Sequence, residues 1–308
     1  MSFAITVVTQ VLIMFVIVII GIIAFKLNLV NKDGNVQLTN ILLNIVNPMV
    51  MLTAYQTPFD KTKAFNLVIA LCLAVASHLI GMAFSYIFIR NKNNPNAAVE
   101  RFSIIYPNCG FMALPLINAL FGSDGIFYAS AYLIVFNILS WTHGYISMSG
   151  KKDIKAISKS FISPTIIAIV VGLVLFFFSI PLPEVLSKSA NMIADLNSPI
   201  AMLILGISIA STDVFAAFKS KRVYFIVFLM DIVVPLTALF IYSFLPISRD
   251  IVLINMIATA CPSAILTILF ATKFGRDSTY AAKILAVANI TCVITIPVVL
   301  TIATLVLK

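Results

Sequence analysis

The sequence predicts an all-α integral membrane protein with ten transmembrane helices, and three observations lead to this prediction. Of the 308 residues, 61% are hydrophobic and only 10% are charged, whereas a soluble domain is closer to half apolar and a quarter charged. The mean hydropathy is +1.11. The apolar residues form runs of about 20, the length that crosses a bilayer as a helix. Short polar loops separate these runs.

The ten helices are expected to follow one another closely, without room for a soluble domain between them. The longest loop is the basic stretch near 148–160, which contains GKKDIKAISK. The predicted spans are 5–25, 37–56, 64–89, 102–121, 125–147, 161–180, 190–211, 222–245, 251–271 and 279–306.

The basic residues predict the orientation in the membrane. If the N-terminus is outside, fifteen of the twenty Lys and Arg residues fall in cytoplasmic loops. The positive-inside rule then predicts a multi-pass protein of the plasma (inner) membrane with both termini extracytoplasmic. The net charge of +9 does not indicate nucleic-acid binding, because no basic patch is interleaved with aromatic residues.

Similar residues recur about 153 positions apart, which indicates an internal repeat. Each half, 1–150 and 151–308, contains five predicted spans. Because five is odd, the second half must enter the membrane from the opposite side, and such inverted repeats are typical of secondary transporters. The matching features are Pro48 and Pro199, ALFGSD (119–124) and TKFGRD (272–277), His78 and Asp231, and Asn137 and Asn289.

Two predicted spans contain residues that interrupt a helix. Span 4 carries Pro107, Asn108 and Gly110, and span 9 carries Pro262 next to Ser263. Proline removes a backbone donor and clashes with the preceding turn, and unwound backbone is tolerated in a bilayer only inside protein or beside an aqueous cavity. Helix N-termini at such breaks attract anions. The two breaks therefore predict an anion-binding site near the middle of the membrane.

The segment NCGFMALP (108–115) resembles the asparagine-to-proline crossover of the auxin efflux carrier family, which includes plant auxin exporters and bacterial malate-permease-like proteins. The FG at 121–122 and NILSW at 137–141 fit the same pattern. The short loop after span 5 resembles the bacterial branch, since plant members carry a long hydrophilic loop there. Plant members also have an acidic residue in span 3, where this chain has His78. The acidic residue of this chain instead lies in span 8, at Asp231.

The resemblance covers essentially the whole chain and implies a fold like that of the bile-acid sodium symporters. Spans 4 and 9 would cross, spans 1, 2, 6 and 7 would form a scaffold, and spans 3–5 and 8–10 would form the transport domain. The family's crossover asparagine maps onto Asn108, its polar residue in span 5 onto Asn137 through Trp141, and its span 9 proline onto Pro262.

These observations define the expected site. His78 and Asp231 are the expected coupling residues, because ionisable groups at membrane depth are functional candidates and histidine titrates near neutral pH. The coupling ion would be a proton or sodium; no cofactor and no protein-bound metal are expected, and a sodium site is not located. The residues expected to bind substrate are Asn47, Asn108, Cys109, Gly110, Asn137, Pro262, Ser263 and Asn289.

The predicted function is secondary active transport of small organic anions, malate-like or auxin-like, by an elevator mechanism. The partners would be the anion, the lipid bilayer and, through the scaffold helices, a second copy of the chain. An anion channel or a potential-driven uniporter is the main alternative. An intramembrane hydrolase is a remote one, because GISIAS (206–211) only loosely resembles a serine elbow and no metal-binding motif appears.

Overall fold

The computed structural model describes residues 3–90, 94–151, 163–212 and 217–307. Helices make up 82% of the chain, and the described residues contain no strand. In order, the helices and π-helical turns (η) are α1 Phe3–Lys26, α2 Lys32–Ile41, η1 Leu42–Val46, α3 Asn47–Ala54, α4 Lys61–Phe88, α5 Ala97–Ile105, η2 Cys109–Ala113, α6 Leu114–Leu139, η3 Ser140–Gly144, α7 Tyr145–Ser149, α9 Pro164–Phe177, α10 Glu184–Ala194, α11 Asn197–Ala210, α13 Lys221–Phe228, η4 Leu229–Val233, α14 Val234–Tyr242, α15 Arg249–Thr259, α16 Leu266–Lys273 and α17 Ser278–Val306.

The prediction of an all-α membrane protein is confirmed. By length and composition, seven helices in the described part of the chain can cross a membrane. One of them, Cys109–Ser149, has 41 residues and contains a non-helical position at Gly122, with φ 61° and ψ −152°. The shorter helices α5, α9, α15 and α16 lie among these long ones. The basic stretch expected at 148–160 lies mostly outside the described residues.

Several helices begin earlier than the apolar pattern indicated, and α2 and α5 are examples. Helix α2 starts at Lys32 rather than 37, because Oδ1 of Asn31 accepts the N–H of Gly34 (2.8 Å) and caps the first turn. Helix α5 starts at Ala97 rather than 102 and contains the buried Glu100. The first turn of α2 is polar, and in α5 the charged residues Glu100 and Arg101 interrupt the apolar run, so hydropathy alone did not include these residues in a span.

Three of the π-helical turns end two residues before a proline: η1 before Pro48, η2 before Pro115 and η4 before Pro235. A proline within a helix has no N–H and its ring clashes with the carbonyl of the fourth residue before it. A π-helical turn widens the backbone at this position and relieves that clash. These prolines therefore shape the helices locally without ending them.

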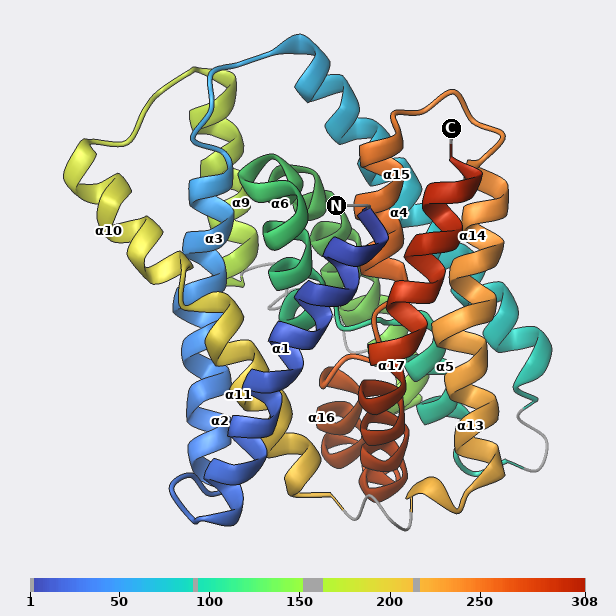
Figure 1. The fold of residues 1–308 in the computed structure, drawn as a ribbon. Helices are drawn as coiled ribbons and strands as arrows, with labels where there is room; N and C mark the ends of the chain where they lie inside the picture. Colours follow the sequence, from blue (N-terminus) through green and yellow to red (C-terminus); the bar gives the residue numbers. More distant parts are fainter. Residues whose placement is uncertain (1–2, 91–93, 152–162, 213–216, 308) are drawn as a thin grey trace.

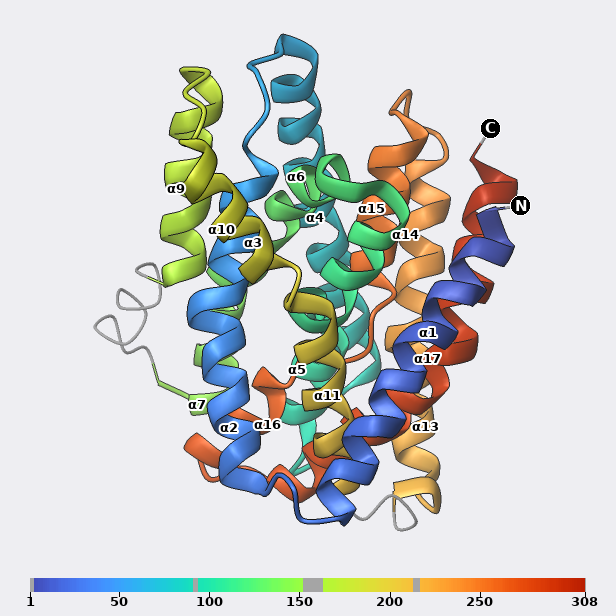
Figure 2. The same ribbon diagram turned by 60° about the vertical axis from the view of Figure 1, so that its left-hand side comes forward.

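Helices α1 and α11 pack backbone to backbone at two glycines. A Cβ atom on Gly21 would lie 2.6 Å from the carbonyl oxygen of Leu203, and a Cβ on Gly206 would overlap the carbonyl oxygen of Val18. Small residues allow this close approach in membranes, where dispersion contacts rather than the hydrophobic effect hold helices together. Each view shows α1 running diagonally, beside α17 (Figures 1 and 2).

A buried carboxylate joins three helices that are far apart in the sequence. Glu100 of α5 is 1% exposed and accepts two hydrogen bonds from Arg222 of α13 (2.9 and 2.6 Å). It also accepts from the Tyr280 hydroxyl of α17 (2.8 Å) and from Asn94 Nδ2 (2.7 Å). Because both carboxylate oxygens have partners, the buried charge is compensated.

The two ends of the chain lie at the same end of the helical bundle (Figure 1). At the opposite end α2 meets the loop that follows α1, and α13 and α16 also reach this end (Figures 1 and 2). Helix α3 continues α2 toward the end that holds the termini. The chain thus runs through the bundle repeatedly and returns to the side on which it started.

We predict that Gly206→Ala destabilises the protein by about 1–3 kcal/mol, because a methyl group cannot enter the α1–α11 contact without separating two backbones. Thermal unfolding of the detergent-purified protein measures this as a lower Tm. Gly34→Ala is the matched control, since its Cβ would meet only the side chains of Val30 and Asn31 and no backbone atom of another helix. Equal Tm values for Gly206→Ala and the parent would contradict the close packing.

Candidate functional site

Two interrupted helices meet in the middle of the structure. Helix α5 ends at Ile105 and η2 begins at Cys109, while α15 ends at Thr259 and α16 begins at Leu266. The intervening backbones run antiparallel, with Pro107 opposite Ser263. The N–H of Asn108 donates to the carbonyl of Pro262 (2.6 Å), and the N–H of Ala264 donates to the carbonyl of Tyr106 (3.0 Å).

This pairing explains how the chain tolerates two breaks at membrane depth. A buried backbone donor or acceptor without a partner is destabilising by an amount comparable to a lost hydrogen bond. Each non-helical segment supplies the other with a donor and an acceptor, so neither needs water. Pro107 and Pro262 fit here because they have no N–H to satisfy. Pro115, by contrast, lies within the first turn of α6 and does not contribute to the break.

The paired segments border a cavity of about 280 Å³, which we call the crossover cavity. Apolar and aromatic side chains make up most of its wall, and none of the described residues that line it carries a charge. It is lined by Thr39, Leu43, Asn44 and Asn47 from α2 to α3, by Asn108, Cys109, Gly110 and Phe111 at the start of η2, by Leu133, Phe136, Asn137 and Trp141 from α6 and η3, by Ser163, Pro164 and Thr165 at the start of α9, and by Ala264, Ile265, Leu266 and Leu269 at the start of α16.

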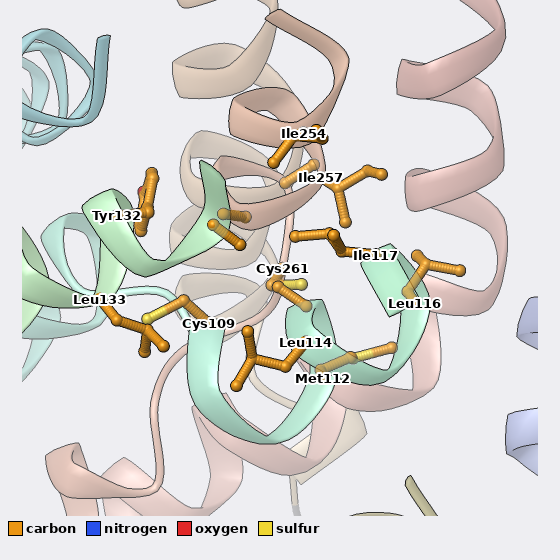
Figure 3. Close-up of a cluster of buried hydrophobic side chains, with 14 of the residues drawn as sticks. Cys109, Met112, Leu114, Leu116, Ile117, Tyr132, Leu133, Ile254, Ile257 and Cys261 are labelled. Atoms are coloured by element: carbon orange, nitrogen blue, oxygen red, sulfur yellow. The ribbon is translucent and has the colours of Figure 1, made fainter. Parts of the chain in front are cut away.

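Tight apolar packing also supports the break. Figure 3 shows side chains of η2, α6 and α15 gathered into one cluster, with Cys109, Met112 and Tyr132 among them. Protein interiors are close-packed and hardly compressible, so a change of even one methylene group in side-chain volume disturbs them. The position of the η2 backbone at the cavity is therefore determined by the core as well as by its hydrogen bonds.

Asn108 begins the helix that follows the first break. Its side-chain Oδ1 accepts the N–H of Phe111 (3.3 Å), so the residue acts as an N-cap. The side chain is 2% exposed and lines the cavity. Its Nδ2 has no hydrogen-bond partner, which is uncommon for a buried donor. A bound acceptor in the cavity would satisfy it.

The cavity also lies at the N-terminal ends of two helices. The first residues of η2 and the residues that lead into α16 are part of its wall. Helix N-termini carry partial positive charge and orphan N–H groups. Together with the unpartnered amide of Asn108, they make this cavity suitable for a negatively charged or polar acceptor group without the presence of a cation.

Five of the eight expected substrate-binding residues line this cavity: Asn47, Asn108, Cys109, Gly110 and Asn137. Pro262 and Ser263 instead contribute through the backbone pairing. The hydroxyl of Ser263 is buried and hydrogen bonded to that of Thr267 (2.8 Å).

Asn289 does not line the cavity. It is fully buried in α17, where its Nδ2 donates to the carbonyl of Leu285 (2.7 Å). Its Oδ1 has no partner.

The chain as a whole was compared with protein-family models. A model described as "Membrane transport protein" matches residues 6–300. The chain belongs to this membrane transport protein family. The match confirms the resemblance to auxin efflux carriers at the level of the family, whose members are transporters rather than enzymes. No curated protein matches the chain.

In this family member the two expected coupling residues do not line the cavity. His78 of α4 lies against the rings of Tyr132 and Tyr106, with ring centroids 4.9 and 6.1 Å away. Its Nδ1 is 2.7 Å from the carbonyl oxygen of Ala74, and Nε2 has no partner. Asp231 of η4 is fully buried and accepts a hydrogen bond from the Thr291 hydroxyl (3.3 Å).

Several cavity residues were not expected from the sequence. Phe111, Phe136 and Thr165 are examples, and the last of these lies on α9, far from the breaks in the sequence. Leu133, Asn137 and Trp141 are spaced four residues apart, which places them on one face of a helix. This spacing could have indicated that Leu133 and Trp141 line the same space as Asn137. No sequence pattern indicated that the start of α9 faces the same space.

We predict that Cys109 is the cysteine that a small neutral thiol reagent reaches through the cavity. In a Cys72→Ser background, methyl methanethiosulfonate should modify one thiol, because Cys109 lines the cavity while Cys261 and Cys292 are buried away from it. Mass spectrometry of the intact protein and its peptides identifies the site. Cys109→Ser should abolish the modification, and faster labelling of Cys261 or Cys292 would contradict the geometry.

Proposed function

We propose that this protein is a secondary active transporter of small organic anions that works by an elevator-type alternating-access mechanism. The observation that carries the proposal is a cavity at the pairing of two interrupted helices, with the unpartnered Nδ2 of Asn108 at its wall and no charged side chain among its described lining residues. Carriers commonly bind substrate near the membrane midplane where discontinuous helices meet. Membership of the membrane transport protein family supports the same function.

We also propose ten spans arranged as two inverted repeats. A continuous helix of 41 residues would be about 60 Å long, twice the thickness of the hydrocarbon core, so Gly122 divides Cys109–Ser149 into two spans. The pairs α5 with η2, and α15 with α16, then each form one interrupted span, and α9 forms another. Gly122 and Gly275, which match in the expected repeat, both have a positive φ, 61° and 63°. Both ends of the chain lie at the same end of the bundle (Figure 1), and an even number of spans, such as ten, would place them there.

The walls of the cavity support an elevator mechanism. Its lining comes partly from α2, α3 and α9, in the expected scaffold, and partly from η2, α6 and α16, in the expected transport domain. Movement of one group past the other would carry a bound anion across the membrane. We place the protein in the plasma (inner) membrane with extracytoplasmic termini, on the positive-inside rule, and propose that the scaffold helices form a homodimer.

The lining favours an anion with one carboxylate and an apolar body over malate. The cavity offers apolar surface from Leu133, Phe136, Trp141 and Leu269. None of its described lining residues supplies a cation for a second carboxylate, and burial of an uncompensated charge is strongly unfavourable. The substrate we propose is therefore closer to the auxin-like than to the malate-like members. A hydrolase is not supported, because GISIAS forms the last turn and the C-cap of helix α11, whereas a serine elbow needs a strand-to-helix turn.

Counterflow in proteoliposomes tests the proposal. Vesicles that contain the purified protein are loaded with an unlabelled carboxylate and diluted into the same labelled anion, using malate and several apolar monocarboxylates in turn. A carrier accumulates label transiently against the internal pool, and a channel does not. Absence of counterflow for every anion, together with conductance in planar bilayers, would favour the channel alternative.

We predict that Asn108→Ala lowers anion uptake about tenfold to a hundredfold while the protein inserts and purifies normally. The loss corresponds to one hydrogen bond to a charged acceptor, about 1.5–3 kcal/mol. Ser263→Ala should have a smaller effect, because its hydroxyl is paired with Thr267. Asn118→Ala is the control, since Asn118 lies outside the crossover cavity. Unchanged uptake by Asn108→Ala would remove the crossover from the mechanism.

We predict that Asp231→Asn retains exchange between equal pools but loses accumulation driven by a proton or sodium gradient. Moving an anion through a low-dielectric region is easier when a cotransported cation compensates its charge, and Asp231 is a carboxylate fully buried within a span. His78→Gln should shift or flatten the pH dependence of uptake between about pH 5 and 8. If both variants accumulate the anion like the parent, transport is potential-driven uniport.

A further inference from the structure

The amide groups of Asn47 and Asn108 present the same end to the crossover cavity. Asn108 Oδ1 is occupied by the N–H of Phe111, and its Nδ2 has no partner. Asn47 Oδ1 accepts a hydrogen bond from Nδ2 of Asn197 (2.7 Å), and all three asparagines are buried. In both cavity residues the acceptor oxygen is already used, so the donor nitrogen is the group left for a ligand.

The nitrogen of Asn47 lies beside the crossover backbone. A Cβ atom built on Gly110 would be 3.8 Å from Asn47 Nδ2, and Asn47 and Gly110 both line the cavity. Asn47 therefore brings a donor from α3 to the place where η2 begins. Two neutral donors from different helices can bind a carboxylate without the desolvation penalty of a buried cation.

An asparagine side chain has a donor end and an acceptor end of nearly the same shape, so its hydrogen-bond partner decides which end faces a ligand. For Asn47 that partner is Asn197, the first residue of α11. Asn197 does not line the crossover cavity. It lies at a second, separate cavity of about 150 Å³ with Thr53, Asn118 and Asp195.

We propose that Asn197 is a positioning residue: by donating to Asn47 Oδ1, it keeps the Asn47 amide nitrogen directed at the crossover cavity, and so makes the site prefer a carboxylate over a neutral amide. The inference rests on the proposed function, because it concerns how the same cavity selects an anion. It adds a residue from outside the cavity whose effect on a ligand is exerted through Asn47.

A matched pair of probes, phenylacetate and phenylacetamide, tests this proposal. They have the same apolar body, but the amide replaces one carboxylate oxygen with an NH₂ donor. Binding of each is measured on the purified protein in nanodiscs by isothermal titration calorimetry. The parent should bind phenylacetate at least about tenfold more tightly, because two donors face the cavity.

Asn197→Leu removes the donor without adding charge and should reduce the preference to about threefold or less, since the Asn47 amide can then turn its oxygen toward the ligand. Asn197→Ala is tested in parallel, with monodisperse elution and Tm as checks of folding. Asn47→Asp replaces the donor nitrogen directly and should also remove the preference. Asn191→Leu, at the same second cavity, is the matched control and should bind both probes like the parent.

A merely structural role for Asn197 predicts that both probes weaken by the same factor, and that result would overturn the proposal. An unchanged preference in the Asn197 variants, or a parent that binds neither probe or prefers phenylacetamide, would also overturn it. If counterflow of organic anions is nevertheless observed, the proposed function stands and only the role of Asn197 fails. If counterflow is absent as well, the proposed function fails too.

Discussion

Backbone pairing between residues 106–108 and 262–264 is the constraint on which the centre of this structure depends. Two hydrogen bonds, Asn108 to Pro262 and Ala264 to Tyr106, give partners to groups that helical geometry leaves unsatisfied. In a bilayer no water is available to take their place. The breaks are therefore interdependent, since each segment is stable at this depth because the other is present.

The location of the cavity follows from this constraint. Where two helices stop and restart, their backbones and first turns cannot fill space as continuous helices do. The start of η2 and the start of α16 border the opening, and α6 with η3 completes one wall. The remaining wall comes from α3 and α9, so a ligand in this space touches parts of the chain that are more than 100 residues apart.

The buried polar groups of this protein are used in two different ways. Glu100 is charged, but Arg222, Tyr280 and Asn94 supply all its hydrogen bonds, and it joins α5, α13 and α17. At the cavity, by contrast, the polar groups are neutral and incompletely paired. Compensated charge suits a contact that holds helices together, whereas unpartnered neutral donors suit a ligand that must also be released.

The sequence by itself determined the class of protein, the family and the places where helices are interrupted. Hydropathy identifies membrane helices because lipid excludes polar side chains over a fixed thickness. Pro107 next to Asn108 and Gly110, and Pro262 next to Ser263, indicate breaks because proline has no N–H to donate within a helix. The resemblance to the family selected Asn108 and Asn137, and Asn47 was expected beside them; all three line one cavity. Hydropathy did not include the capped polar first turn of α2 or the first residues of α5, where Glu100 and Arg101 interrupt the apolar run. Only the tertiary structure decided which groups meet across the chain. The partner of Asn47, the contribution of Thr165 to the cavity wall and the burial of Glu100 depend on helix packing. Contacts between distant segments have no signature in the local pattern of either segment.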